Sequence, residues 1–259
     1  MYREITADEY KRYFGFEDDY KIEGFLVYGA WDVEKYTKEI IKELSGYNLE
    51  ISSRRLGSFL FDITELVINR KIYWVGVCYG AAKLSEYTHL ACLFGSKWVL
   101  QVGSAGGLAV DSQTLDLIIP DKSFSEDCAN SLYKSENDNL LLKKYLKNFF
   151  TKQNVSIKSG VSISIQTMMG ESLPDILQWS KLGYVCVDME ASTVMSVSNF
   201  FNVPSASVLY ISDNLAKEET VLTESYEAQK IKRLEVKKMI YSAVCNLIKN
   251  PPAFNCGRK

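Results

Sequence analysis

Two short stretches of this chain, VDMEAS at Val187–Ser192 and YISDN at Tyr210–Asn214, indicate both its fold and its site. Each belongs to an apolar run typical of a buried strand, and Glu190 and Asp213 lie where that run gives way to polar residues. In open α/β sheets, ligands bind beyond the carboxyl ends of the strands. The two acids therefore predict a site that holds sugar hydroxyls and transfers a proton.

The composition is typical of one compact enzyme domain. The 259 residues contain no linker rich in Pro, Gly or Ser, so we expect one domain over residues 1–259, with an N-terminal extension at 1–20 and a tail at 251–259. A net charge of −2 argues against a nucleic-acid or membrane-surface partner. No apolar run approaches the ~18 residues that span a bilayer. The charged start, MYREITADEY, lacks the apolar core of a signal peptide, so the expected location is the cytoplasm.

The six cysteines, at positions 78, 92, 128, 186, 245 and 256, show no CxxC spacing, and several lie in apolar runs. We interpret them as reduced core thiols, as expected in the cytoplasm. The same spacing argues against a zinc site, and we expect no bound metal. His89 is the only histidine and lies within a predicted helix, so we expect a packing or surface role for it rather than a catalytic one.

Strand and helix patterns alternate along the chain. We expect strands at 24–28, 56–61, 63–68, 71–77, 97–102, 116–119, 156–165, 184–187 and 205–211. We expect helices at 32–44, 83–94, 140–152, 174–182, 191–201 and within 219–250, and a polar loop over 123–139. This alternation, with glycines at the turns, predicts an α/β fold with a mixed, mostly parallel sheet covered by helices.

Two turns made of small residues are candidate ligand loops. Gly103–Gly107 (GSAGG) follows a predicted strand, where small residues let backbone N–H groups approach a ligand, although a tight turn explains them equally well. The segment is neither a Walker loop nor a Rossmann fingerprint. Gly29 begins the turn after another predicted strand and precedes Asp32 and Glu34, which are either site residues or, more simply, first-turn acids that complement the helix dipole.

Glu190 and Asp213 also have structural explanations. Glu190 begins a predicted helix, where acids are common, and Asp213 precedes Asn214 and could cap a helix. A carboxylate can also accept one hydrogen bond per oxygen from two neighbouring sugar hydroxyls. An acid at a strand end can protonate a leaving group. Taken one at a time, these residues leave both explanations open.

Taken in order, GSAGGL (Gly103–Leu108), VDMEAS and NVPSASVLYISDN (Asn202–Asn214) resemble the nucleoside phosphorylase superfamily. That superfamily contains purine nucleoside and uridine phosphorylases and the methylthioadenosine/S-adenosylhomocysteine nucleosidases. The resemblance covers Gly24 to about Asn250. It implies a single-domain, three-layer α/β sandwich, with a barrel-like core in its sheet, that cleaves a ribosyl N-glycosidic bond. It also implies a homo-oligomer, a nucleoside as the small-molecule partner, and no cofactor apart from phosphate as a possible co-substrate.

The resemblance assigns roles to residues at matching positions. Glu190 would bind the ribose 2′ and 3′ hydroxyls, Met189 would pack beneath the sugar, and Asp213 would protonate N7 of a purine. The segments expected to contact the base are Ser104, Ala105 and Gly106, and Gln166, Thr167 and Met168. Such a site fits an oxocarbenium-like transition state, in which the sugar is held and charge on the base is neutralised.

The phosphate ligands of the family are not reproduced. Val33 and Gln101 stand where the phosphorylases have arginines, so two forked phosphate ligands are missing. The nucleosidases instead use a glutamate of the first helix to position water, and Glu34 falls at that place. A third family arginine reaches into a neighbouring subunit. The candidates for a phosphate or water site are Gly29, Ser104 and, at the place of that third arginine, Arg54 or Arg55.

Other departures concern the substrate. The segment Gly170–Ser172 lacks the Gln and Arg with which uridine enzymes read uracil, and Asp188 and Leu209 replace a glutamate and an arginine of relatives. We therefore predict cleavage of a purine-type nucleoside, with hydrolysis preferred and phosphorolysis at an atypical phosphate site as the alternative. A catalytically weak nucleoside-binding or storage protein is the second alternative, since a fold does not set a function. A dimer and a hexamer are both open.

Overall fold

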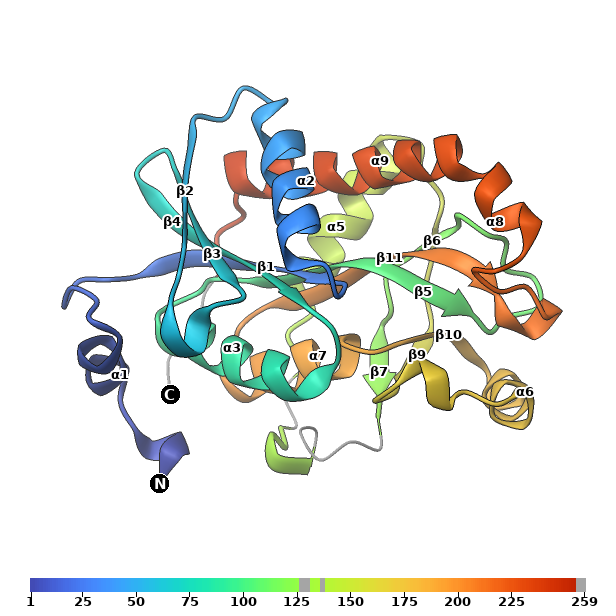
Figure 1. Ribbon diagram of the computed structural model, residues 1–259, viewed down its shortest axis with the longest axis horizontal. Helices are drawn as coiled ribbons and strands as arrows, with labels where there is room; N and C mark the ends of the chain where they lie inside the picture. Colours follow the sequence, from blue (N-terminus) through green and yellow to red (C-terminus); the bar gives the residue numbers. More distant parts are fainter. Residues whose placement is uncertain (126–130, 136–137, 255–259) are drawn as a thin grey trace.

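The computed structural model describes residues 1–125, 131–135 and 138–254, in which strands and helices alternate (Figure 1). The strands are β1 (Ile22–Gly29), β2 (Ile51–Arg55), β3 (Ile63–Ile68), β4 (Lys71–Cys78), β5 (Val99–Gly107), β6 (Leu117–Ile118), β7 (Lys122–Phe124), β8 (Ile157–Lys158), β9 (Val161–Ser164), β10 (Tyr184–Asp188) and β11 (Ser205–Asn214). The α-helices are α1 (Ala7–Phe14), α2 (Val33–Ser45), α3 (Ala81–Leu93), α5 (Leu141–Lys152), α6 (Leu173–Lys181), α7 (Ala191–Phe200), α8 (Glu224–Ala228) and α9 (Lys230–Lys249). Short 3₁₀ turns are η1 (Tyr2–Glu4), η2 (Ser58–Leu60), η3 (Met168–Gly170) and η4 (Leu215–Lys217).

Strand β5 is the centre of the sheet. It pairs in parallel with β1 on one side and with β11 on the other, and its last two residues pair antiparallel with β10. From β1 the sheet continues to β4, β3 and β2, and from β10 it continues to β9 and β7. Six of the ten pairings among the described residues are parallel. The prediction of a mixed, mostly parallel sheet is confirmed.

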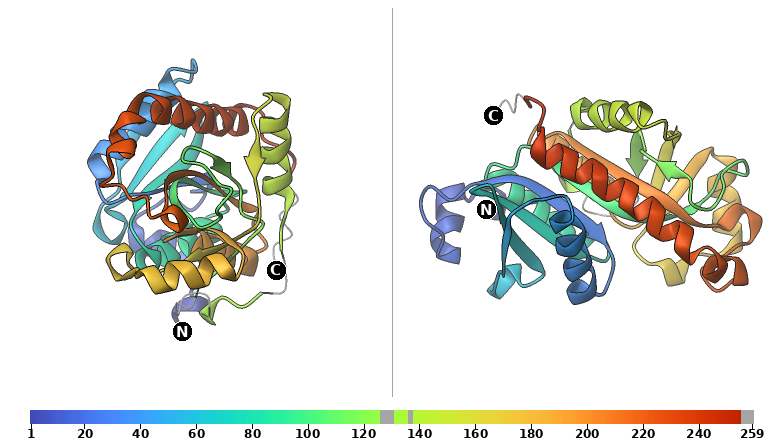
Figure 2. Two further views of the ribbon diagram at one scale, coloured as in Figure 1. Left: turned by 90° about the vertical axis from the view of Figure 1, so that its right-hand side faces the viewer. Right: turned by 90° about the horizontal axis from the view of Figure 1, so that it is seen from above.

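Helices cover both faces of this sheet. On one face, α2, α5 and α9 bury apolar side chains against β1, β5 and β11 (Figure 1). On the other face lie α3 and α7, which contact each other, and Figure 2 shows the sheet between the two helical layers. Ile40 and Leu44 of α2 and Leu84 and Tyr87 of α3 are inaccessible to solvent and mark the two apolar cores. One α/β domain with helices on both faces confirms the predicted fold class.

Several predicted elements differ in the structure. Residues 56–61 are not a strand, because β2 ends at Arg55 and η2 follows, with Ser58 at a φ of 55°. Gly103–Gly107 is not a loop but the second half of β5, since its backbone pairs with β11 and, at its end, with β10. The helix predicted within 219–250 is two helices, α8 and α9, which meet at Gln229.

Two further predictions are altered by the backbone. The strand predicted over 156–165 is divided into β8 and β9, and Gly160 between them has a φ of 152° that favours glycine. The loop predicted over 123–139 begins inside β7, and residues 126–130 and 136–137 of it lie outside the described residues. Among the residues described, no helix is both long enough and apolar enough to cross a bilayer.

The N-terminal segment contains a helix that the sequence patterns did not predict. Thr6 and Glu9 form a capping box at the start of α1, in which each side chain bonds the backbone N–H of the other. Phe14 and Phe16 then pack edge-on against Phe94 at the end of α3. These aromatic contacts hold α1 against the domain, at the lower left of Figure 1.

The cysteines and the histidine are mainly core residues. Cys78, Cys92, Cys186 and Cys245 are buried and not in disulfides, as predicted, whereas positions 128 and 256 lie outside the described residues. His89 is buried, its Nδ1 lies 2.9 Å from the Tyr133 hydroxyl, and its ring packs edge-on against Phe201. Burial lowers the pKa of His89 to about 4, with a smaller contribution from Arg3, so the ring is neutral at physiological pH. The predicted packing role of His89 is confirmed.

Candidate active site

The motifs VDMEAS and YISDN meet at the end of β5. Gly106 pairs with Asp213 of β11 on one side and with Val187 of β10 on the other. Beyond Val187, β10 ends at Asp188, and α7 begins after Glu190. The sheet therefore places the acid of YISDN and the acids of VDMEAS on either side of the same glycine-rich strand, which local sequence patterns alone did not require.

Glu190 is enclosed by two glycines. Its Oε1 accepts a hydrogen bond of 2.8 Å from the backbone N–H of Gly80, at the start of α3. Its Oε2 lies so near Gly29 that a Cβ on that residue would be 2.7 Å away. Any larger residue at position 29 would displace the carboxylate, which explains a glycine at the end of β1. The side chain of Met189 lies close by, with its Cε 3.8 Å from where a Gly80 Cβ would be.

The protonation of Glu190 is set by its surroundings. Only 5% of the residue is exposed. Burial, followed by the negative charge of Asp188, raises the pKa of Glu190 to about 8, although backbone hydrogen bonds from Gly80 and Met189 oppose the shift. At neutral pH the carboxyl is therefore largely protonated in the free protein. A carboxyl in this state can donate one hydrogen bond and accept others, which suits two adjacent hydroxyl groups.

Asp213 lies at the end of β11 beside a β-bulge. The register with β5 shifts between Ile211 and Asp213, so Ser212 is the extra residue, and its hydroxyl donates to Asp213 Oδ1. Bulges re-aim the side chains next to them. Burial raises the pKa of Asp213, while the Ser212 hydrogen bond and the charge of Arg233 oppose that rise. A buried acid that keeps its proton more readily than usual is suited to donate it to a leaving group.

Two charged residues near Asp213 were missed by sequence reasoning. Glu171 is half-buried, and burial together with the charge of Asp213 raises its pKa to about 7. Arg233 of α9 is only 8% exposed, its guanidinium lies 3.6 Å from the centre of the Tyr226 ring, and its Nε has no hydrogen-bond partner among the described residues. Neither has a local signal, because their neighbours in sequence are ordinary helix and turn residues.

The residues predicted to contact the base lie at two places around the site. Ser104 is exposed on β5, Ala105 is buried, and Gly106 is partly exposed between Asp213 and Val187. Gln166 and Thr167 are exposed after β9, and Met168 is partly exposed. The carbonyl of Gln166 lies 4.0 Å from where a Gly80 Cβ would be, which places this segment next to the contact between Gly80 and Glu190.

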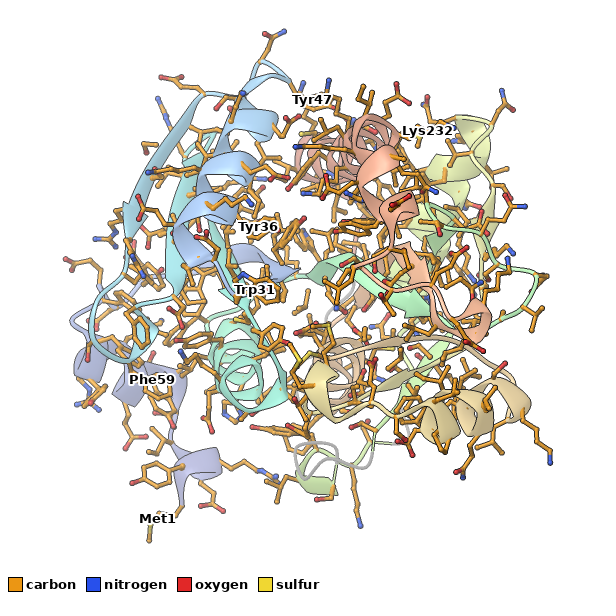
Figure 3. The ribbon with its side chains drawn as sticks, turned by 45° about the vertical axis from the view of Figure 1, so that its right-hand side comes forward. Met1, Trp31, Tyr36, Tyr47, Phe59 and Lys232 are labelled. Atoms are coloured by element: carbon orange, nitrogen blue, oxygen red, sulfur yellow. The ribbon has the colours of Figure 1, made fainter. Side chains whose placement is uncertain are left out.

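An exposed aromatic pair accompanies the two glycines that enclose Glu190. Trp31 follows Gly29 by two residues, and Tyr79 directly precedes Gly80. Their ring centres are 5.6 Å apart in an edge-on arrangement, and the residues are 71% and 46% exposed. Figure 3 shows Trp31 at the turn between β1 and α2.

Glu34 and Val33 begin α2. Val33 is partly buried against the apolar core below this helix. The Glu34 side chain is 73% exposed, and its Oε1 lies 2.5 Å from Lys38 Nζ, one turn along the helix. The hydrogen bond from Lys38 lowers the pKa of Glu34. The structure therefore presents Glu34 as an ionised, solvent-facing acid rather than a buried one.

The two arginines predicted for a phosphate or water site lie on β2, and each has a partner. Arg54 bonds Glu65 of β3 through two nitrogens, at 2.7 and 3.1 Å. Arg55 Nε donates to the carbonyl of Phe61 at 2.6 Å, and its guanidinium also lies 4.0 Å from Asp62. Both side chains are more than half exposed, at 61% and 56%. They remain accessible from the surface of this strand.

Gln101, which stands in place of a family arginine, is buried in β5. Its Nε2 donates to Asp188 Oδ2 at 2.9 Å. None of the ion pairs formed by the described residues involves Asp188, Glu190 or Asp213. The acids of the site are thus held by neutral donors.

Comparison with known proteins agrees with this fold. A family model described as the phosphorylase superfamily matches residues 75–244. A DeoD-type purine nucleoside phosphorylase of Clostridium perfringens is 25% identical over 173 residues, which cover 64% of this chain and 74% of that protein. The uridine phosphorylase of Vibrio fischeri ES114 has a similar structure, with a TM-score of 0.71 and 19% identity over 90% of this chain and 95% of that one. For the methylthioadenosine/S-adenosylhomocysteine nucleosidase of Campylobacter jejuni, the TM-score is 0.68 and the identity 14%, over 88% and 99% of the two chains. Because the family model matches more than half of the chain, this protein belongs to the phosphorylase superfamily.

Proposed function

We propose that this protein cleaves the N-glycosidic bond between ribose and a purine-type base, with water as the nucleophile. Members of the superfamily are nucleoside phosphorylases or nucleosidases, and are therefore enzymes. The single observation that carries the proposal is the position of Glu190, whose two carboxyl oxygens face Gly80 N–H and Gly29 at the end of β1. A carboxyl held there is oriented to bind the 2′ and 3′ hydroxyls of a ribose, with Met189 beneath the sugar.

The base is assigned to the opposite side of Gly106. Asp213 would donate its proton to N7 of the purine, so that the base leaves as a neutral molecule. Ser104, Ala105, Gly106, Gln166, Thr167 and Met168 would surround the ring. Glu171, with its pKa near 7, adds a second carboxyl on this side that can donate or accept at neutral pH. N7 is an acceptor that purines have and pyrimidines lack, so a proton donor on this side suits a purine better than a pyrimidine.

Water is proposed as the nucleophile because a dianionic phosphate needs cations. Phosphate sites in proteins use arginine forks or lysines. Here Val33 and Gln101 are uncharged, and Arg54 is already bonded to Glu65 through two nitrogens. A water molecule needs no such cation.

Phosphorolysis is the second candidate, and Arg55 favours it. The guanidinium of Arg55 is exposed, with Asp62 as a distant partner, so a phosphate could take up its free nitrogens. The DeoD-type relatives are also named as phosphorylases.

The nucleophile is identified by incubating the protein with inosine, adenosine or methylthioadenosine in phosphate-free buffer and then with added phosphate. We expect free base and free ribose at the same rate in both buffers, because water is always present. Base release that appears only with phosphate, together with ribose 1-phosphate, would show phosphorolysis instead. No base release from any nucleoside, with nucleoside-dependent thermal stabilisation, would identify a binding protein.

Glu34 is proposed as the base that orients the attacking water, at the start of α2. Its ion pair with Lys38 does not prevent this, since a fully exposed pair of this spacing contributes little and breaks easily. Glu34→Gln is expected to lower kcat by about 10²-fold or more, in the range of general-base contributions. Lys38→Met is the matched control, because it frees Glu34 and should leave kcat within about threefold. Equal rates for Glu34→Gln and the unmodified protein would exclude this role.

A further inference from the structure

A buried polar network lies beneath the turn that carries Glu190. Four strands contribute to it: Gln101 from β5, Ser164 from β9, Asp188 from β10 and Ser207 from β11. Each of the four residues is at most 6% exposed. Buried polar groups in such a place are costly unless every one of them has a partner. A network that brings together four strands at one end of the sheet therefore needs an explanation beyond packing.

Asp188 is the acceptor at the centre of this network. Its Oδ2 accepts from Gln101 Nε2 at 2.9 Å, from Ala191 N at 2.7 Å and from Glu190 N at 3.2 Å. Its Oδ1 accepts from the Ser164 hydroxyl at 2.6 Å. A carboxylate has about four acceptor positions, so Asp188 uses its full capacity. Two of these bonds reach the backbone at the start of α7, and they tie the conformation of Glu190 to the position of Asp188.

Gln101 is oriented by its other partner. Ser207 Oγ donates to Gln101 Oε1 at 2.5 Å, which leaves the amide nitrogen facing Asp188. The Gln101 side chain therefore links Ser207 of β11 to Asp188 of β10 through two hydrogen bonds. Because the amide is neutral, it orients the Asp188 carboxyl through a hydrogen bond and not through a charge.

We propose that Gln101 and Asp188 are positioning residues that hold the carboxyl of Glu190 against Gly29 and Gly80, and thereby make the protein select ribonucleosides over 2′-deoxyribonucleosides. This inference rests on the proposed function, in which Glu190 binds the sugar hydroxyls. Neither residue touches the substrate. The selectivity depends on this support because Glu190 is itself the N-cap of α7, and its own side chain makes no capping bond there. Misplacement of a binding group by about 1 Å can cost about 10² in rate.

Inosine and 2′-deoxyinosine differ only at the 2′ hydroxyl, one of the two that Glu190 would bind, so the ratio of their kcat/KM values measures this contact. Leaving a buried hydrogen-bonding group without its partner costs about 1–3 kcal/mol, which predicts a ratio of about 5-fold or more for the unmodified protein. Gln101→Met and Asp188→Ala should lower kcat/KM more for inosine, which loses both hydroxyl contacts with Glu190, than for 2′-deoxyinosine, which has only the 3′ contact to lose, so the ratio should fall toward one.

Asp188→Asn tests whether the hydrogen bonds carry the effect. Asparagine keeps one oxygen for the three N–H donors at Oδ2 and turns its amide toward the Ser164 hydroxyl, which can accept. We expect it to retain most of the selectivity that Asp188→Ala loses. Lys143→Met is the control for removal of a buried charge elsewhere: Lys143 of α5 is 4% exposed and donates to the Asp121 carbonyl. It should leave the ratio unchanged.

The outcomes separate the two proposals. If the unmodified protein discriminates between the nucleosides and Gln101→Met and Asp188→Ala keep the same ratio, the positioning role is wrong and the proposed function stands. If the unmodified protein releases no base from inosine, adenosine or methylthioadenosine, the proposed function fails. In that case, the rise in unfolding temperature caused by inosine is compared with the rise caused by 2′-deoxyinosine, which measures the same preference without turnover. If the difference between these two rises is the same in the unmodified protein and in the variants, the positioning role is wrong. Variants are compared only where their unfolding midpoints show a folded protein.

Discussion

Asp213→Asn is expected to lower kcat by about 10²–10⁴-fold while the protein stays folded, which is the usual range for the loss of a positioned general acid. The substitution keeps the shape of the side chain and its bond with Ser212, but an amide has no proton that it can give to a leaving base. Because Asp213 lies at the end of a central strand and is not ion-paired in the described residues, little else should change. Rates of base release from inosine, with the unfolding midpoint of each protein, measure the effect.

The pH dependence of the same variant adds an independent test. Burial raises the pKa of Asp213, so the protonated form persists to higher pH than for an exposed aspartate, and activity should fall as pH rises through that pKa. The asparagine variant should lack this alkaline decline. Asp116→Asn is a suitable control, since this acid directly precedes β6, is partly exposed and is paired with Lys158 of the neighbouring strand β8. Unchanged turnover in Asp213→Asn would remove Asp213 from the mechanism.

Glu190→Gln is expected to weaken the use of ribonucleosides strongly and, at the same time, to stabilise the fold at alkaline pH. In the protonated carboxyl the hydroxyl oxygen can both donate and accept, whereas the amide nitrogen of glutamine can only donate. One acceptor contact to the sugar is therefore lost, and kcat/KM for inosine should fall by about 10–100-fold. The loss should be smaller for 2′-deoxyinosine, which lacks one of these hydroxyls. Steady-state kinetics with the two nucleosides at pH 7 measure it.

The gain in stability follows from the raised pKa of Glu190. The value of about 8 in the folded protein lies above the ordinary 4.5, so between these pH values the folded state binds more protons than the unfolded state. The free energy of unfolding therefore falls as pH rises from about 4.5 through about 8. Glutamine does not titrate and escapes this loss. Each pKa unit corresponds to about 1.4 kcal/mol, so the difference should be on the order of a few kcal/mol at pH 9.

Thermal unfolding of both proteins at pH 5 and pH 9 checks this expectation. A few kcal/mol corresponds to roughly 5–10 °C in a domain of this size. Glu171 and Asp213 also titrate with raised pKa values, but they are present in both proteins and cancel in the difference. If Glu190→Gln unfolds at the same temperature as the unmodified protein at pH 9, Glu190 is already ionised without cost, and its proposed environment is wrong.

Local patterns were sufficient for elements whose burial is regular. The strands before VDMEAS and within YISDN lie where the apolar runs predicted them, and α7 follows Glu190 as expected. Gly103–Gly107 was misjudged because small residues favour turns locally, whereas here their backbone is paired with β11 and β10. The break between α8 and α9 at Gln229 was also missed, since no Pro or Gly marks it.

The order of GSAGGL, VDMEAS and YISDN was enough to identify the family and, through it, the fold and the acids to examine. The side chains and backbone groups that surround those acids could not be predicted from the sequence. Only the folded chain shows that Gln101 donates to Asp188 and that Gly29 and Gly80 enclose Glu190. The same holds for the charges of Glu171 and Arg233 near Asp213. The physical reason is that motifs are read from neighbours along the chain, whereas burial, hydrogen bonding and charge at a site depend on which distant strands the sheet brings together.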